Sequence, residues 1–308
     1  MSISDVLAGY DRIRAKNEIE LKRRRRDVYS KVPQLKDLHA QKTALQLKRI
    51  QQSLSGEEFG NSDILALREN ANMLLVGAGY DIHYLDPIYD CPVCRDTGSK
   101  DDAQQCECFT RRVLEDKLAA AKLSDNSISF ELFDIGMFDD TPMKSGKSQR
   151  QIMSKIRQLG EEYADAFPLC DPYMILSGAT GLGKTFLSKC IQRRVIERGY
   201  TTAFYTAYRL FSMFHRDRLG EAVDLSAMFE VPLLVIDDVG TEPMTRNVTV
   251  EYFFDLINER NNAGLHTIIV TNLALHEIKD RYGGHIHSRL MDRYTSKKII
   301  FSGRDIRY

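Results

Sequence analysis

The chain has no long apolar run and no net charge, because its 308 residues carry 43 Lys and Arg against 43 Asp and Glu. Without about 18 consecutive apolar residues a helix cannot span a bilayer, which excludes a helical membrane protein and a membrane partner. Without net charge, no overall field draws the chain to nucleic acid, so any basic surface must be local.

The first twenty residues, "MSISDVLAGYDRIRAKNEIE", lack the apolar segment of a signal peptide. We therefore expect a cytoplasmic protein, whose thiols are kept reduced. One basic run, "KRRRR" at residues 22–26, is ordinarily a solvated helix face, and a nucleic-acid contact is the alternative.

Cysteine is scarce, with six in the chain, yet four of them follow the spacing C-x2-C-x11-C-x-C: Cys91, Cys94, Cys106 and Cys108. In a reducing compartment this pattern favours a metal site over disulfides, and Zn²⁺ takes four tetrahedral ligands of this kind. The polar stretch between the pairs has no core of its own, so the metal would replace one. Four protein ligands indicate a structural site. A redox pair or free thiols are the alternatives, and His83 is a reserve ligand.

Three regions follow from composition and periodicity. Residues 1–120 read as a helical domain that contains the cysteine knuckle at 91–108, with Pro33 dividing one long helix into two. Residues 121–150, rich in Ser, Asp and Gly, read as a linker. Residues 151–308 alternate apolar runs with helical stretches, which predicts an α/β domain with a parallel sheet. Its strands are expected at 173–178, 202–206, 232–238, 266–272 and 297–303.

A phosphate-binding motif follows the first of these strands. "GATGLGKT" fits G-x4-G-K-[ST] between a strand and a helix. Its glycines let backbone N–H groups surround phosphates, its lysine neutralises the β- and γ-phosphates, and its threonine offers a hydroxyl to Mg²⁺. The ATP-binding residues are therefore predicted to be Gly178, Ala179, Thr180, Gly181, Leu182, Gly183, Lys184 and Thr185.

Two later strands end in polar residues that would complete such a site. "LLVIDD" ends in Asp237, a Mg²⁺ ligand, and Asp238, a general base for the attacking water; helix capping is the alternative. "TIIVTN" ends in Asn272, whose amide can orient that water.

Together these stretches resemble the AAA+ P-loop ATPases and, more narrowly, the bacterial replicative-helicase loaders of the DnaC/DnaI type. The resemblance includes "HIHSRLMDR" and "GRDIRY" and, in the first half, "RRRRDVYSKVPQL" and the cysteine knuckle. It implies that Arg289 is an arginine finger for a neighbouring subunit's nucleotide and that Arg307 is the second sensor arginine. A surface ion pair is the ordinary interpretation of Arg289 without the resemblance.

Two departures from the family pattern stand out. Asp238 replaces the glutamate typical of AAA+ enzymes, so water must lie closer and hydrolysis is expected to be slow. Only 124 residues follow Lys184, which predicts an ATPase domain without a full helical lid.

The stretch "TAYRLFSMFHRDR" interleaves aromatic residues with arginines, a composition that suits single-stranded DNA. The candidates are Tyr208, Phe211, Phe214, Arg209, Arg216 and Arg218. Phe211 and Phe214 also lie at core spacing, so plain packing is the alternative for these two.

The resemblance implies an ATP-dependent loader of a hexameric replicative DNA helicase onto single-stranded DNA. The zinc-binding domain would hold the helicase, the chains would form a homo-oligomer on it, and the ATPase would be weak alone. An IstB-type ATPase helper of a DNA transposase is the alternative, and a P-loop kinase of small molecules is a third.

Overall fold

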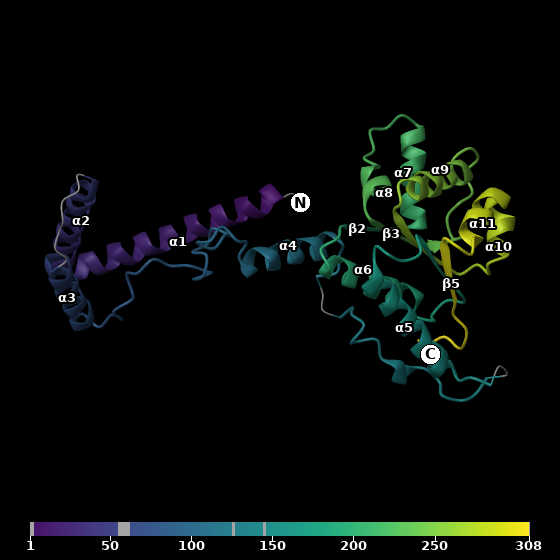
Figure 1. The fold of residues 1–308 in the computed structure, drawn as a ribbon, viewed down its shortest axis with the longest axis horizontal. Coiled ribbons are helices and arrows are strands. Elements are labelled where there is room, and N and C mark those ends of the chain that lie inside the picture. The colour runs from purple at the N-terminus through teal and green to yellow at the C-terminus, as the bar shows by residue number, and fades with distance from the viewer. Residues whose placement is uncertain (1–2, 55–61, 125–126, 144–145, 308) are drawn as a thin grey trace. The chain divides into compact units, whose positions relative to one another are not determined.

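Two units of different architecture make up the chain, Met1–Val113 and Leu114–Tyr308. The computed structural model describes residues 3–54, 62–124, 127–143 and 146–307 (Figure 1). A helical first unit and an α/β second unit confirm the predicted fold class. Within the described ranges, none of the helices is both long and apolar enough to cross a membrane.

Long helices dominate the first unit, and Pro33 sets where the first two meet. The helices are α1 (Ile3–Lys31), α2 (Pro33–Leu54) and α3 (Ser62–Gly77), with α2 and α3 side by side in Figure 1. The residue before a proline is pushed out of the α-helical region, whereas proline itself suits the first helical turn. The break at Pro33 is therefore confirmed. Val28, Leu35 and Leu75 form a buried cluster that joins the three helices.

The second unit is built on a five-stranded parallel sheet in the order β2-β3-β4-β1-β5. Its strands, each within three residues of the predicted bounds, are β1 (Tyr173–Ser177), β2 (Thr202–Thr206), β3 (Leu233–Val239), β4 (His266–Thr271) and β5 (Ser296–Ile300). β1 pairs with β4 on one side and β5 on the other. The carboxyl ends of β1, β3 and β4 therefore meet at one edge of the sheet, where ligands of open α/β folds bind.

Helices cover both faces of this sheet (Figure 1). They are α5 (Gln149–Ala166), α6 (Lys184–Glu197), α7 (Ala207–Arg218), α8 (Ser226–Glu230), α9 (Thr249–Asn262), α10 (Glu277–Tyr282) and α11 (Gly284–Met291). A further helix, α4 (Glu107–Ala120), begins in the first unit and ends in the second. Met174 and Leu176 of β1 belong to the core with α5 and α6, whereas Tyr173 and Ile175 belong to the core with α7 and α9. Burial on both faces explains why the strands read as continuous apolar runs.

Part of the predicted linker, residues 121–150, belongs to the core of the second unit. Phe130, Phe133 and Phe138 are buried there around a short 3₁₀ helix, η1 (Ile135–Met137). Phe133 stacks on Phe138 at 6.1 Å between ring centroids and meets Phe186 of α6 edge-on at 5.7 Å. The Ser- and Asp-rich composition conceals these widely spaced aromatic residues.

We predict that Phe130→Ala destabilises the second unit by about 3–5 kcal/mol, because it removes a fully buried ring. Leu132→Ala is the matched control, since Leu132 is 54% exposed whereas Phe130 is 2% exposed, and an exposed truncation costs within about 0.5 kcal/mol. Urea unfolding followed by circular dichroism measures both, with the transition of the second unit identified by its shift on addition of ATP. Equal effects of the two substitutions would contradict the assignment of this segment to the core.

Candidate nucleotide site and cysteine cluster

The loop after β1 turns sharply into α6 and buries the ammonium group of Lys184. Lys184 Nζ donates to the carbonyl oxygens of Gly178 (2.8 Å) and Ala179 (2.6 Å) and to Asn272 Oδ1 (2.9 Å). Burial lowers the pKa of Lys184, and the charges of Asp238 and Asp237 oppose that shift. The lysine therefore joins the phosphate-loop motif to the end of β4, as the two motifs require.

Two glycines of this loop have no room for a side chain. Gly178 has φ 152°, and a Cβ there would lie 2.4 Å from the carbonyl oxygen of Phe301. Gly181 has φ 75°, in the left-handed region, and a Cβ there would lie 1.9 Å from a carboxylate oxygen of Asp305. Glycine is needed at both positions for conformation and for close approach.

Thr185 and Asp237 form a hydroxyl–carboxylate pair at the start of α6. Thr185 Oγ1 donates to Asp237 Oδ1 at 3.0 Å, and Asp237 is buried. Burial, and next the charge of Asp238, raises the pKa of Asp237, while the Thr185 hydroxyl lowers it. A hydroxyl beside adjacent carboxylates is a donor set that suits Mg²⁺, whose charge would also relieve the repulsion between the two acids.

Asp238 turns away from its neighbour because its backbone is left-handed, with φ 57°. Aspartate is one of the few residues that adopt this conformation readily. The register of β3 against β4 shifts between Ile236 and Val239. Asp237 is consequently buried and bonded to Thr185, whereas Asp238 is exposed and lines a hollow beside the phosphate-binding loop.

This hollow, about 350 Å³, collects most of the residues predicted for nucleotide. It is lined by Thr180, Gly181, Leu182, Gly183, Lys184, Thr185, Phe186, Asp238, Asn272, Ile306 and Arg307. Of the predicted residues, Gly178 and Ala179 instead hold Lys184 through their carbonyl groups, and Asp237 binds Thr185 from behind. Arg289 does not line the hollow of its own chain. It lies on α11 with its guanidinium 5.6 Å from the ring centre of Phe254.

Sequence reasoning missed two residues that hold Arg307 and its segment. Asp305 binds Arg307 through Nε–Oδ1 (3.0 Å) and Nη2–Oδ2 (2.8 Å). Gln149 at the start of α5 clamps Arg304, accepting from its backbone N–H at 3.0 Å and donating to its carbonyl oxygen at 2.9 Å. The hydrogen bond from Ile306 N–H to the Gly181 carbonyl (3.1 Å) then fixes the segment on the phosphate loop. In the sequence, the sign of this pair was the position of Asp305, an acid two residues before Arg307.

A buried acid, Glu242, was also missed. Its carboxylate accepts from Gly240 N–H at 2.8 Å, from Arg281 Nε at 3.2 Å and from the Tyr282 hydroxyl. Burial and the Glu242 charge raise the pKa of Tyr282 far above its ordinary value. Glu242 thus ties the loop that follows Asp238 to α10. Its position in the polar stretch after β3, "DVGTE", gives no sign of burial.

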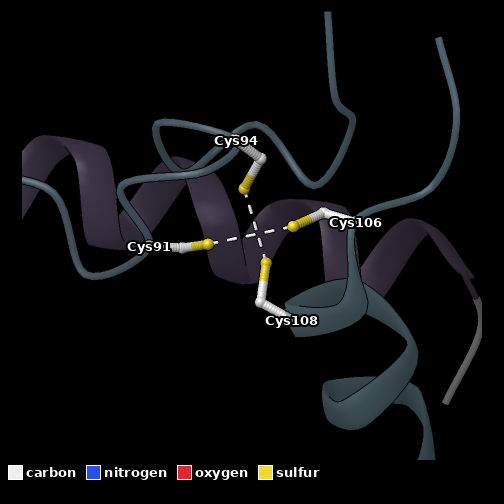
Figure 2. A group of neighbouring side chains, drawn as sticks. All are labelled: Cys91, Cys94, Cys106 and Cys108. Atoms are coloured by element: carbon white, nitrogen blue, oxygen red, sulfur yellow. Dashed lines mark hydrogen bonds between the residues drawn. The ribbon is translucent and has the colours of Figure 1, made fainter. Parts of the chain in front are cut away.

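The four clustered cysteines converge on one point in the first unit (Figure 2). Their sulfur atoms all lie within 4.8 Å of one another, with Cys91 and Cys106 3.8 Å apart and Cys94 and Cys108 3.4 Å apart. Zn–S bonds of about 2.3 Å place tetrahedral sulfurs at similar separations. The donor set and its geometry therefore fit a structural Zn²⁺ ion.

Local turns bring the two cysteine pairs together. Cys106 precedes α4 and Cys108 lies in its first turn, so the chain direction changes between them, as Figure 2 shows. Asp96, left-handed and fully buried, accepts from Cys91 N–H at 2.7 Å and so closes the first turn. The Tyr10 hydroxyl of α1 lies 3.0 Å from Cys108 Sγ. His83 is outside the cluster: it is exposed and bonded to Asp86 Oδ2 at 2.8 Å, so it is not a reserve ligand.

The candidate DNA stretch separates into core and surface. Phe211 and Phe214 are residues of α7 and are buried in the core, which confirms the packing alternative for these two. Tyr208 is 65% exposed, and the Arg209 guanidinium lies over the Tyr205 ring at 5.7 Å. Arg216 pairs with Glu221 at 2.6 Å.

The second unit is similar to a known family of proteins. The family model described as IstB-like ATP binding protein matches residues 110–304. The chain is 29% identical over 154 residues to the protein YdaV of Escherichia coli K12, with 48% of this chain and 58% of that protein covered. It is 30% identical over 132 residues to a protein of Geobacillus stearothermophilus named as an ATP-binding protein of insertion sequence IS5376, with 42% and 52% covered. The chain thus spans little more than half the length of these two relatives.

A third relative aligns over a longer region. The replicative helicase loader DnaI of Bacillus subtilis 168 is 22% identical over 237 residues, covering 73% of this chain and 68% of that protein. Among solved structures, the DnaC helicase loader is similar with a TM-score of 0.45 and 18% identity, over 56% of this chain and 98% of that one.

We predict one zinc ion per chain, removed by Cys91→Ser. Because the metal replaces a hydrophobic core, the substitution should unfold the knuckle and leave ATP binding intact. Cys170→Ser is the matched control, since Cys170 is a free, half-buried cysteine outside the cluster. Elemental analysis of protein purified without chelator measures the metal. A zinc content near zero in the unmutated, folded chain would refute the assignment.

Proposed function

Because this chain belongs to the family of IstB-like ATP-binding proteins, we propose that it is an ATPase that loads a replicative DNA helicase onto single-stranded DNA. The observation that carries the proposal is the cysteine module joined to the ATPase unit. The alignment with the helicase loader DnaI covers 73% of the chain, roughly 225 of 308 residues. The second unit, Leu114–Tyr308, has only 195 residues. The loader alignment therefore reaches into the first unit.

The residues around the hollow have separate tasks in this proposal. Lys184 and the backbone N–H groups of the loop bind the β- and γ-phosphates of ATP, and Thr185 with Asp237 holds Mg²⁺, which supplies charge neutralisation. Asp238 accepts the proton of the attacking water, and Asn272 orients that water. Arg307 contacts the nucleotide from the carboxyl-terminal segment after it leaves Asp305.

We predict that Asp238→Asn binds ATP but hydrolyses it about 10²- to 10⁴-fold more slowly, because an amide cannot accept the proton. Lys184→Ala should fail to bind ATP at all, since it removes the buried cation that lines the hollow. A fluorescent ATP analogue measures binding, and phosphate release measures turnover. Hydrolysis by Asp238→Asn at the unmutated rate would show that Asp238 is not the base.

Arg289 is proposed to act on the neighbouring chain, since it lies outside the hollow of its own chain. We predict that Arg289→Ala retains ATP binding and loses the stimulation of turnover by helicase or single-stranded DNA, which for an arginine supplied in trans can reach about 10³-fold. Mixing Arg289→Ala with Lys184→Ala should restore part of the activity, because one chain brings an intact pocket and the other an intact arginine. A co-assembled mixture without activity excludes a role in trans.

The transposition helper is the second candidate, and the relative from insertion sequence IS5376 favours it. A binding experiment separates the two. The full chain, with Cys91→Ser as the control that lacks the folded knuckle, is tested by biolayer interferometry against the replicative helicase and a transposase of the same organism. The loader proposal requires helicase binding that depends on the knuckle. Binding to the transposase alone would replace it with the helper.

A further inference from the structure

The first unit contains a second hollow, of about 320 Å³, away from the cysteine cluster. Its walls come from α1, α2, α3 and the segment after α3. Most of its exposed lining is polar, and Leu35 and Leu75 lie buried behind it. Ile82, 44% exposed at the rim, is the apolar side chain that a ligand can reach. A polar hollow with an apolar residue at its rim can bind a ligand with both characters.

Positive charge dominates the rim of this hollow. Arg25, Lys42 and Arg68 line it, one from each helix. Across the part of the chain that the structure describes, none of these three cations has an acidic partner within ion-pair distance. The one acid in the wall, Asp86, is bonded to His83. Arg25 belongs to the basic run of residues 22–26. Its neighbours Arg23 and Arg24 pair with Glu20, whereas Arg25 does not.

His39 lies within this positive field. Burial lowers its pKa, and the charges of Lys42 and Arg25 lower it further. Its Nδ1 is 2.8 Å from the Tyr29 hydroxyl, so the floor of the hollow is organised by internal contacts. Three unpaired cations around a concave surface would gain from an anionic partner.

We propose that this hollow binds an acidic segment of a protein partner, with carboxylates on Arg25, Lys42 and Arg68 and an apolar side chain against Ile82. The inference deepens the proposed function, in which the first unit docks on another protein, but its test needs no helicase. Single-stranded nucleic acid fits less well. Bases stack on exposed aromatic rings. Of the rings that line the hollow, Tyr29 and His39 contact each other and His83 is bonded to Asp86.

Amide and hydroxyl side chains add to this preference. Thr43, Gln46 and Asn72 line the same hollow. Such groups can donate to and accept from a peptide backbone, which offers both functions. Phosphate oxygens accept hydrogen bonds, so they would use only the donor groups of these side chains.

The chain has no tryptophan, which allows a single reporter at the rim. Gln46→Trp in the full chain is titrated with a synthetic amphipathic peptide of Glu and Leu, with the same peptide bearing Gln for Glu, and with oligo-dT. The Glu peptide should change the tryptophan emission and bind at least about tenfold more tightly than the Gln peptide, because only the Glu peptide can form charge pairs with the three cations. Raising the salt concentration should weaken it.

A charge-reversed set tests the assignment of the residues. Arg25→Glu, Lys42→Glu and Arg68→Glu together should weaken the Glu peptide about tenfold or more. Arg12→Glu, Lys16→Glu and Lys36→Glu alter the net charge equally at exposed positions outside the hollow, and they should change binding less than about threefold. Zinc content and circular dichroism verify that both sets fold.

Three outcomes would overturn the inference. If the Glu peptide does not bind, or both charge-reversed sets weaken it equally, the hollow is not its site. If oligo-dT binds more tightly than the Glu peptide and loses binding in the first set, the hollow is a nucleic-acid site. If the full chain does not bind the helicase but binds the Glu peptide as expected, the loader proposal is wrong and the peptide site still stands.

Discussion

The buried ammonium group of Lys184 is the contact on which the nucleotide site depends. An ammonium without acceptors would be costly to bury, and its three acceptors come from the loop after β1 and from Asn272 after β4. The same lysine therefore fixes the loop and orients the amide. Thr185, its neighbour in sequence, faces Asp237 at the end of β3. Two adjacent residues of α6 thus bring together the ends of three strands.

The two units are stabilised in different ways. The second unit buries apolar residues on both faces of a parallel sheet and has an extensive core. Around the cysteines the first unit buries only a few side chains, among them Val6, Tyr10 and Phe109. Burial raises the pKa of the Cys108 thiol to about 12, so a zinc ion bound by the cluster would have to displace its proton. Metal binding and folding of this region would consequently be linked.

Features encoded by neighbouring residues were predictable from the sequence. The phosphate loop, the acids at the end of β3 and the cysteine pairs each lie within a short stretch, and the strands stand out as apolar runs. Features that depend on distant partners were not. Gln149 clamps Arg304 from 155 positions away, and Glu242 meets Tyr282 across 40. The alternatives for Phe211 and Phe214 were equal in sequence, and only the packing of α7 on the sheet decided between them. The role of Arg289 concerns an assembly of chains, so neither a local pattern nor the fold of one chain determines it.

Under the proposed role of Arg307, its pair with Asp305 would make the segment of residues 304–307 a competitor of the nucleotide. Asp305 lies against Gly181 and satisfies Arg307 through two hydrogen bonds. A polyphosphate that recruits Arg307 must take it from this carboxylate, and the negative charge of Asp305 beside the loop disfavours a second anion. By thermodynamic linkage, the factor by which bound nucleotide would weaken the pair equals the factor by which the pair would weaken nucleotide binding. The position of residues 304–307 would then report the occupancy of the site to any molecule that contacts them.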